Sequence, residues 1–245
     1  MRQLVLSLFP GIGLLDMAFE QEGFTVVRGP DLLWGGDIRT FHVPAGRFDG
    51  VIGGPPCQPF SPLANIARAR YGDSSIAEDL IPEYERVVRE ARPEWFVMEN
   101  VPRAPEPDIA GFVVRSLVLN NRWIGEEQRR TRRFSFGTSD GRVLSIDDEL
   151  VLLENPRMEL AVVATRGGGG AGLMNGRTQA CEDRVRSAIH RTLEEACRLQ
   201  GLPPDFLDGS PFTSDGKRRA IGNGVPIPMG RAIARAVKRA LEATL

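Results

Sequence analysis

Short apolar segments that end in glycine or proline turns alternate with segments of helical periodicity along most of the chain. Within 78–92, apolar residues recur at three- and four-residue spacing, and Pro93 ends this predicted helix. The alternation favours an α/β fold built on a Rossmann-like, doubly wound and mostly parallel sheet. The predicted strands are 4–9, 24–27, 49–52 and 95–98, and the predicted helices are 14–22, 78–92 and 228–245.

Composition sets limits on location and partners. The 245 residues carry a formal net charge of −1, so any contact with nucleic acid must come from local basic clusters. No run of about 18 apolar residues is present, which argues against a membrane span. The apolar N-terminus leads directly into a glycine turn and is interpreted as a buried strand and not a signal peptide, so a cytoplasmic location is expected.

The cysteine pattern argues against metal and disulfide chemistry. Cys57, Cys181 and Cys197 are widely spaced, no CxxC pair exists, and the chain has two histidines. We therefore expect no metal site and a reduced compartment.

Two long stretches do not fit the strand–helix alternation. Residues 59–79 form a polar loop with Arg68 and Arg70, and residues 138–190 contain the glycine run 167–170. Long loops in compact domains are usually functional or disordered, and glycine runs are flexible or exposed.

A glycine turn follows the first predicted strand. Phe9 to Gly13 has the form of a nucleotide-binding turn, although it lacks the third glycine of a dinucleotide motif. Asp31 follows the second strand, where an acidic residue binds ribose hydroxyls in such folds. A plain tight turn and a solvated aspartate explain these residues equally well.

The segment from Gly53 to Ser61 is more specific. It places Cys57 directly after a predicted parallel strand, at the end where open α/β sheets carry their active sites. Pro55, Pro56 and Pro59 restrict the backbone on both sides of the thiol. A lone cysteine is often core packing, but this sequence of proline, glycine and glutamine favours a functional residue.

Several motifs together resemble the DNA cytosine-5 methyltransferase family, in the order in which that family carries them. The resemblance implies a class I methyltransferase fold that uses S-adenosylmethionine (AdoMet) and acts on double-stranded DNA. The matching segments are 9–13, 36–38, 54–58, 99–101, 128–132 with Gly137, 198–203 and 221–226. By this resemblance, the cofactor-binding residues are Phe9, Gly11, Gly13, Leu14, Asp31, Asp37, Ile38, Pro55, Asn223 and Val225.

The same resemblance implies a covalent mechanism. Cytosine C5 is a poor nucleophile, and addition of the Cys57 thiolate to C6 makes it reactive. Glu99 would contact N3 and the exocyclic amine, while Arg130 and Arg132 would hold the ring carbonyl or a phosphate. The base must leave the helical stack, and 59–79 would act as a closing lid. The substrate-binding residues would be Gln58, Ser61, Arg68, Arg70, Asn100 and Gln128.

Structural alternatives exist for two of these motifs. Glu99 and Asn100 could form a helix cap, and 128–133 could be a solvated basic edge strand. Strand alternation would place Arg130 and Arg132 on one face, with Arg129 and Arg133 on the other, at the surface or against the DNA backbone.

The chain departs from the family pattern in two places. Five residues separate Asp31 from Asp37, too few for the helix usually found there, so one side of the AdoMet pocket should be open. The expected catalytic domain is 1–137 and 191–245, which leaves 138–190 as a reduced target-recognition region. So little material suggests a short recognition site, relaxed specificity, or a protein partner that supplies specificity.

Other functions remain compatible with the sequence. They are the same chemistry on RNA or a free cytidine nucleotide, a non-catalytic or partner-dependent DNA-binding relative, and a nicotinamide-dependent oxidoreductase. A compact methyltransferase suits a restriction-modification system or a phage-infected bacterial cell.

Overall fold

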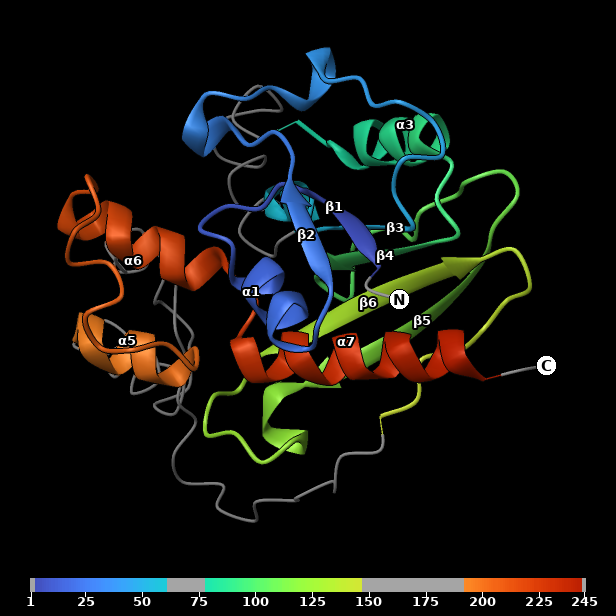
Figure 1. Cartoon of the computed structure of the whole chain (residues 1–245). Coiled ribbons are helices and arrows are strands. Elements are labelled where there is room, and N and C mark those ends of the chain that lie inside the picture. The colour runs from blue at the N-terminus through green and yellow to red at the C-terminus, as the bar shows by residue number, and fades with distance from the viewer. Residues whose placement is uncertain (1–2, 61–77, 147–191, 244–245) are drawn as a thin grey trace, which may run out of the picture.

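A six-stranded sheet forms the centre of the described chain, which in this computed structural model comprises residues 3–60, 78–146 and 192–243 (Figure 1). The strand order is β2-β1-β3-β4-β6-β5. The first four strands run parallel, and β6 runs antiparallel to both β4 and β5. The strands are β1 (Leu4–Leu8), β2 (Thr25–Arg28), β3 (Gly50–Gly53), β4 (Trp95–Asn100), β5 (Val113–Asn120) and β6 (Thr131–Thr138).

Helices cover both faces of this sheet, which confirms the predicted doubly wound α/β class. Figure 1 shows α7 and α3 on opposite sides of the strands, and α1 packs beside α7. One apolar cluster joins α1 and α7 to the sheet, and a second joins α3 to the other face. The helices are α1 (Leu14–Gln21), α3 (Ile81–Ala91), α5 (Leu193–Leu199), α6 (Ser214–Asn223) and α7 (Ile227–Glu242).

Buried aromatic rings fill the core on both sides of β4. Trp95 is fully buried and packs against Phe19, Phe24 and Phe136. On the other face, Tyr84 of α3 donates a hydrogen bond of 3.0 Å to the carbonyl of Val97. Each such ring removes a large apolar area from water, so this core fixes where the carboxyl ends of β3 and β4 lie.

The link between β2 and β3 contains no α-helix, as the five-residue spacing between Asp31 and Asp37 predicted for that part of it. It consists of two single-turn 3-10 helices, η1 (Leu32–Trp34) and η2 (Ile38–Thr40), capped by Asp31 and Asp37. A single turn leaves most of its backbone groups without partners inside the helix, so side chains must hold it in place.

The antiparallel pair β5 and β6 differs from the sequence prediction. β6 lies between β4 and β5, so the interpretation of 128–133 as a solvated edge strand is wrong. β5 was not predicted, because half of its residues are exposed and its pattern lacks a regular apolar alternation.

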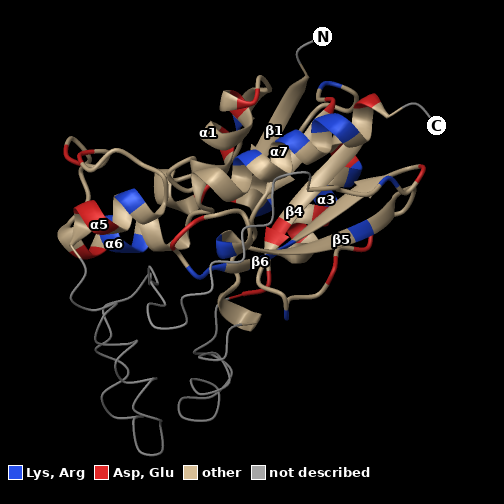
Figure 2. Cartoon of the chain, turned by 90° about the horizontal axis from the view of Figure 1, so that it is seen from below, with Lys and Arg blue, Asp and Glu red and all other residues tan. Residues whose placement is uncertain are grey.

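Charged residues of both signs are interspersed over the elements in Figure 2, in keeping with the net charge of −1. None of the helices among the described residues is long and apolar enough to cross a membrane. Most of the predicted lid, 59–79, and most of the predicted recognition region, 138–190, lie outside the described residues.

Candidate active site

The nucleophile and acid motifs meet at the carboxyl ends of β3 and β4. Cys57 follows β3 after three residues, and Glu99 is the penultimate residue of β4. A Cβ atom at Gly54 would lie 2.8 Å from Oε2 of Glu99, so glycine is needed for the close approach of the two motifs. Asn100 adds a direct link, because its side-chain amide donates a hydrogen bond of 3.2 Å to the carbonyl of Pro55.

Glu99 is paired with the second arginine of the arginine motif. Nε of Arg132 lies 2.7 Å from Oε1 of Glu99, and the Glu99 residue is 8% exposed. The antiparallel register of β4 and β6 sets up this pair, with Glu99 opposite Phe134. Charge-assisted hydrogen bonds of this length are strong, so the carboxylate is held in a fixed orientation at the carboxyl end of β4. The helix-cap interpretation of Glu99 and Asn100 is wrong, because both belong to β4.

Arg130 is buried and points to the end of α6. Its two terminal nitrogens donate hydrogen bonds of 2.9 and 3.3 Å to the carbonyls of Gly222 and Asn223. Burial and the neighbouring charge of Arg132 lower the pKa of Arg130 to about 9, against the attraction of Glu99 and Cys57. The guanidinium therefore remains charged at neutral pH and contributes positive potential near the thiol.

Arg133 lies on the opposite face of β6, as alternation predicted, but it is not at the surface. It is buried, and its guanidinium donates to the carbonyls of Pro102, Ala104 and Pro105. Arg133 therefore fixes the segment that follows β4, and a contact with the DNA backbone is not compatible with this placement.

The glycine turn after β1 is tightly held. Phe9, Gly11 and Gly13 all have positive φ angles, and the turn closes through a hydrogen bond of 2.7 Å from Gly13 N to the carbonyl of Pro10. A positive φ is costly for phenylalanine, which indicates a backbone shape imposed by its surroundings. Asp31 accepts a hydrogen bond of 2.8 Å from Gly11 N, so the predicted ribose-binding residue lies against this turn.

Trp34 closes over the same turn, a contact that the motifs did not predict. Its indole nitrogen donates a hydrogen bond of 2.6 Å to the carbonyl of Gly11, while 58% of the residue stays exposed. Its ring lies 5.6 Å from that of Phe212. No local sequence pattern marks this contact, because Gly11 lies 23 residues from Trp34 in the chain.

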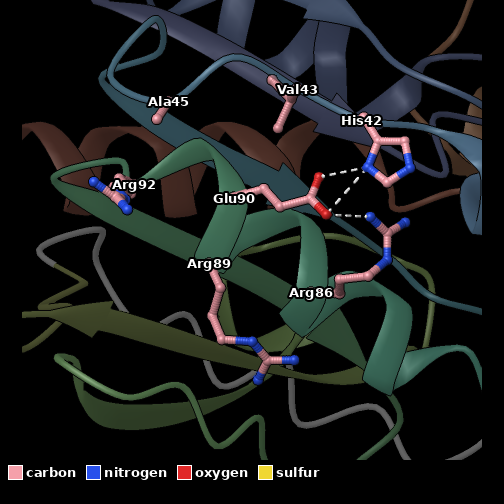
Figure 3. Close-up of a pocket in the computed structure, with 7 residues that line it drawn as sticks. All are labelled: His42, Val43, Ala45, Arg86, Arg89, Glu90 and Arg92. Atoms are coloured by element: carbon pink, nitrogen blue, oxygen red, sulfur yellow. Dashed lines mark hydrogen bonds and ion pairs between the residues drawn. The ribbon is translucent and has the colours of Figure 1, made fainter.

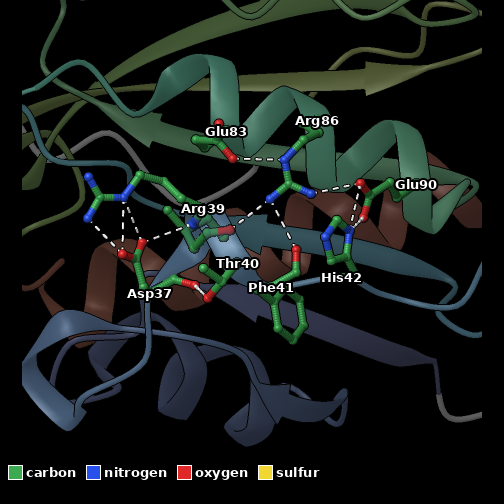
Figure 4. A network of polar contacts seen from close by, with 9 residues as sticks. Asp37, Arg39, Thr40, Phe41, His42, Glu83, Arg86 and Glu90 are labelled. Carbon is green, nitrogen blue, oxygen red and sulfur yellow. Dashed lines mark hydrogen bonds and ion pairs between the residues drawn. The ribbon is translucent and has the colours of Figure 1, made fainter.

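Asp37 and Ile38 lie on the second 3-10 turn. Ile38 is buried in the cluster beneath α3. Asp37 caps η2 and pairs with Arg39, whose side chain lies 2.7 Å from Oδ2 (Figure 4). The hydrogen bonds from Arg39 lower the pKa of the Asp37 carboxyl, which keeps it ionised.

The last motif returns to the glycine turn. A Cβ atom at Gly224 would lie 2.4 Å from the Leu14 side chain, so the segment with Asn223 and Val225 packs directly on the start of α1. Gln200 also holds this segment, through a hydrogen bond of 2.6 Å to the carbonyl of Ile221. Gln200 belongs to the 198–203 motif, but its role could not be read from the sequence.

Some of the predicted substrate-binding residues lie among the described residues and others do not. Gln58 begins a 3-10 turn directly after Cys57, and Asn100 donates to the carbonyl of Pro55 in the same motif. Gln128 is buried, and neither atom of its amide has a hydrogen-bond partner among the described residues. Ser61, Arg68 and Arg70 lie outside the described residues, as does Cys181. Within the described ranges, no group of three or more His, Cys, Asp or Glu side chains is arranged to hold a metal.

Several solved structures with a similar fold are methyltransferases. The methyltransferase EhMeth of Entamoeba histolytica superposes with a TM-score of 0.64 at 13% identity, over 99% of this chain and 100% of that one. Dnmt2 of S. pombe gives 0.62 at 18% identity, with 99% and 100% coverage. A prophage-encoded E. coli protein described as a DNA modification methyltransferase gives 0.61 at 19% identity, with 98% and 100% coverage. These likenesses define the fold as that of a methyltransferase.

The model of the C-5 cytosine-specific DNA methylases matches residues 35–161, just over half of the chain, and the chain belongs to this family. Type II methyltransferase M.AquIA of Picosynechococcus is 36% identical over 41% of this chain and 49% of its own length. M1.HphI of Haemophilus parahaemolyticus is 35% identical over 41% of this chain, which spans 30% of that relative. M.MthTI of Methanothermobacter thermautotrophicus is 23% identical over 98% of both.

The family assignment confirms the enzyme class predicted from the motifs, a DNA cytosine-5 methyltransferase. It also removes the nicotinamide-dependent oxidoreductase as an alternative.

Proposed function

We propose that this chain transfers a methyl group from AdoMet to C5 of a flipped-out cytosine in double-stranded DNA, through a covalent bond between Cys57 and C6. The observation that carries the proposal is the convergence of three side chains at adjoining strand ends. Cys57 follows β3, Glu99 is the penultimate residue of β4, and Arg132 of β6 is paired with Glu99 at 2.7 Å. A thiol, a carboxyl group and a guanidinium at one sheet edge match the needs of cytosine activation.

Each side chain has a defined task. The Cys57 thiolate adds to C6, and the C5–C6 π electrons move toward C5. Glu99 hydrogen-bonds N3 and the exocyclic amine, which stabilises the charge that develops on the ring. Arg132 would offer Nη2 to the ring carbonyl, because its Nε pairs with Glu99 and its Nη1 donates a hydrogen bond of 2.8 Å to the carbonyl of Thr131. After transfer a base removes the C5 proton, the π bond reforms, and the Cys57 thiolate leaves.

The residues around the glycine turn fit AdoMet. The turn precedes the N-terminus of α1, whose backbone N–H groups suit the carboxylate of the methionine part. Asp31 is placed to accept from ribose hydroxyls, and Ile38 and Asp37 lie where the adenine would be read. The segment that contains Asn223 packs on Leu14 through Gly224, and these two segments would form the other side of the AdoMet site. When bound, AdoMet supplies the electrophilic methyl group.

Arg130 supports both halves of this site. Its charge acts on Cys57 and Glu99, while its hydrogen bonds fix the segment of Gly222 and Asn223 beside the glycine turn. We assign it a positioning role and not a contact with the base, because its donors are directed to these carbonyls.

The domain arrangement follows from the same proposal. Residues 1–137 and 191–245 form the AdoMet-binding catalytic domain, and 138–190 form a reduced target-recognition region, aided by a protein partner if specificity is strict. The proposed setting is the cytoplasm of a bacterial or phage-infected cell, as part of a restriction-modification system. Support comes from the type II methyltransferase relatives and the prophage-encoded structure.

The test is transfer of labelled methyl from AdoMet to mixed-sequence duplex DNA, with Cys57→Ala as the matched variant. We expect label at cytosine C5 with wild type and none with the variant, while both proteins bind AdoMet in equilibrium dialysis. RNA and free cytidine nucleotides are assayed in parallel. Transfer to either of these without transfer to DNA would contradict the substrate, and transfer by Cys57→Ala would contradict the mechanism.

A further inference from the structure

Arg86 of α3 reaches across to the second 3-10 turn. One terminal nitrogen donates hydrogen bonds of 2.7 and 3.1 Å to the carbonyls of Ile38 and Phe41 (Figure 4). These two carbonyls lie at the start and just past the end of η2, the turn that presents Asp37. One guanidinium on α3 therefore holds both ends of a segment that itself belongs to no strand or α-helix.

Acidic side chains on α3 keep Arg86 in position. Its Nε lies 2.8 Å from Glu83, and its other terminal nitrogen lies 2.7 Å from Glu90. His42, just beyond η2, contacts the same Glu90 at 3.2 Å. Figure 3 shows Arg86 and His42 converging on Glu90 in an open groove between the 42–45 segment and α3.

The missing helix explains why this contact matters. Only five residues lie between Asp31 and Asp37, so this wall contains no α-helix of its own, and its backbone depends on side chains such as Arg86 of α3. A planar guanidinium with a fixed fork of donors is suited to hold two carbonyls and two carboxylates at once. A lysine ammonium has three donors on a flexible stem and cannot reproduce this arrangement.

We propose that Arg86 is a positioning residue for AdoMet, which sets the geometry of the Asp37 and Ile38 segment without touching the cofactor. The inference rests on the proposed function, in which that segment reads the adenine. It predicts that loss of Arg86 weakens AdoMet binding, whereas the chemistry at Cys57, built on β3 and β4, proceeds normally once AdoMet is saturating.

The experiment compares three variants of the full chain. Arg86→Met keeps the apolar stem and removes every donor, and Arg86→Lys keeps the charge. Arg89→Met is the matched control, because Arg89 stands on the same helix, is about half exposed and pairs with Glu85. AdoMet affinity is measured by equilibrium dialysis without DNA, and kcat and both KM values by methyl transfer.

We expect Arg86→Met to raise the Kd and KM for AdoMet about tenfold, because two charge-assisted hydrogen bonds to the η2 segment are lost. The kcat and the KM for DNA should stay within twofold of wild type. The AdoMet affinity of Arg86→Lys should lie between those of Arg86→Met and wild type, and the AdoMet affinity of Arg89→Met should match that of wild type. Equal AdoMet affinity in Arg86→Met and wild type would overturn the inference. A fall in kcat with no change in the KM for AdoMet would do so as well.

Two further results distinguish a failure of this inference from a failure of the proposed function. If wild type binds no AdoMet, the proposed function fails, whatever Arg86 does. If Arg86→Met does not fold, hydrogen exchange of Arg86→Lys decides, since the amides of Thr40 and Phe41 close η2 and should exchange faster than in wild type. Unchanged exchange in Arg86→Lys would overturn the inference.

Discussion

The catalytic edge and the cofactor wall are built in different ways. At the catalytic edge, Cys57, Glu99 and Arg132 follow from three neighbouring strands whose backbone register fixes their positions. At the cofactor wall, residues 31–43 form two single turns held by Asp31, Trp34 and Arg86 through individual hydrogen bonds. The sheet places the first group, and side chains place the second.

The difference indicates which of the two regions tolerates the loss of a single contact. A sheet edge is held by many cooperative hydrogen bonds and buried apolar area, so it survives the loss of one contact. A wall of single turns depends on a few charged groups, each of which contributes a measurable part of the affinity for AdoMet. We therefore expect substitutions at the edge to change kcat and those in the wall to change the KM for AdoMet.

Glu99→Gln should give the largest effect. The amide keeps the shape of the carboxylate but cannot share a proton with N3, and it leaves Arg132 without its ionic partner. We expect kcat to fall by roughly a factor of 10² to 10⁴, with AdoMet affinity unchanged, as measured by methyl transfer and dialysis. A kcat within threefold of wild type would remove Glu99 from the proposed chemistry.

Arg130→Met should affect both regions at once. The substitution leaves the buried carbonyls of Gly222 and Asn223 without their charged donor. We expect the free energy of unfolding in urea to fall by about 2–4 kcal/mol, and AdoMet affinity and kcat to fall together. If the variant is stable and AdoMet affinity is retained, Arg130 does not connect the two regions.

Asp31→Ala should act on the wall alone. The variant loses the acceptor for Gly11 N and Leu33 N, both at 2.8 Å, as well as the proposed ribose contact. We expect the KM for AdoMet to rise about tenfold with kcat and the KM for DNA unchanged. Asp31→Asn, which keeps one acceptor oxygen, should show a smaller rise; equal rises in the two variants would speak against this explanation.

Asp16→Asn should give the smallest effect, and it depends on pH. Burial raises the pKa of Asp16 above its usual 3.8, against a hydrogen bond from Ser7 and the charge of Arg28. A raised carboxyl pKa stabilises the folded protein below pH 3.8, and this contribution is lost as pH rises through the folded-state pKa. Urea unfolding at pH 4 and pH 7 should therefore show Asp16→Asn gaining stability relative to wild type.

Asp140→Asn provides a control of opposite sign. Hydrogen bonds from Arg142 and Thr138 lower the pKa of Asp140, so its contribution to stability is present above pH 3.8 and is lost as pH falls. This variant should lose stability relative to wild type as pH rises from about 2 to 4, and the difference between the two proteins should then stay nearly constant up to pH 7. The same direction of change in both variants would contradict the assignment of burial as the dominant influence on Asp16.

Much of the fold follows from local sequence patterns. The parallel strands and α1, α3 and α7 were predicted to within a few residues, because apolar periodicity and the breaks at Gly13 and Pro93 act locally. The pair of β5 and β6 was not predicted, since the position of these strands in the sheet depends on pairing between distant segments. Arg133 was misplaced for the same reason, because its burial is caused by carbonyls of the 102–105 segment.

The candidate site divides along the same line. The sequence motifs identified the residues at the strand ends, because chemistry requires specific residue types in a specific order. The side chains of Gln200, Trp34 and Arg86 form hydrogen bonds with partners that lie 21 to 48 residues away in the sequence, so no local pattern marks them. Positioning residues of this kind become visible only when the tertiary contacts are known.

Covalent capture of DNA tests the central claim, that Cys57 attacks C6 of cytosine. A duplex in which 5-fluorocytosine replaces cytosine is incubated with enzyme and AdoMet, because fluorine at C5 prevents loss of the proton that releases the thiol. We expect a complex that survives denaturing electrophoresis and yields, after proteolysis, a DNA adduct on the peptide containing Cys57. Methyl transfer to DNA with no adduct, or an adduct on Cys197, would contradict the account.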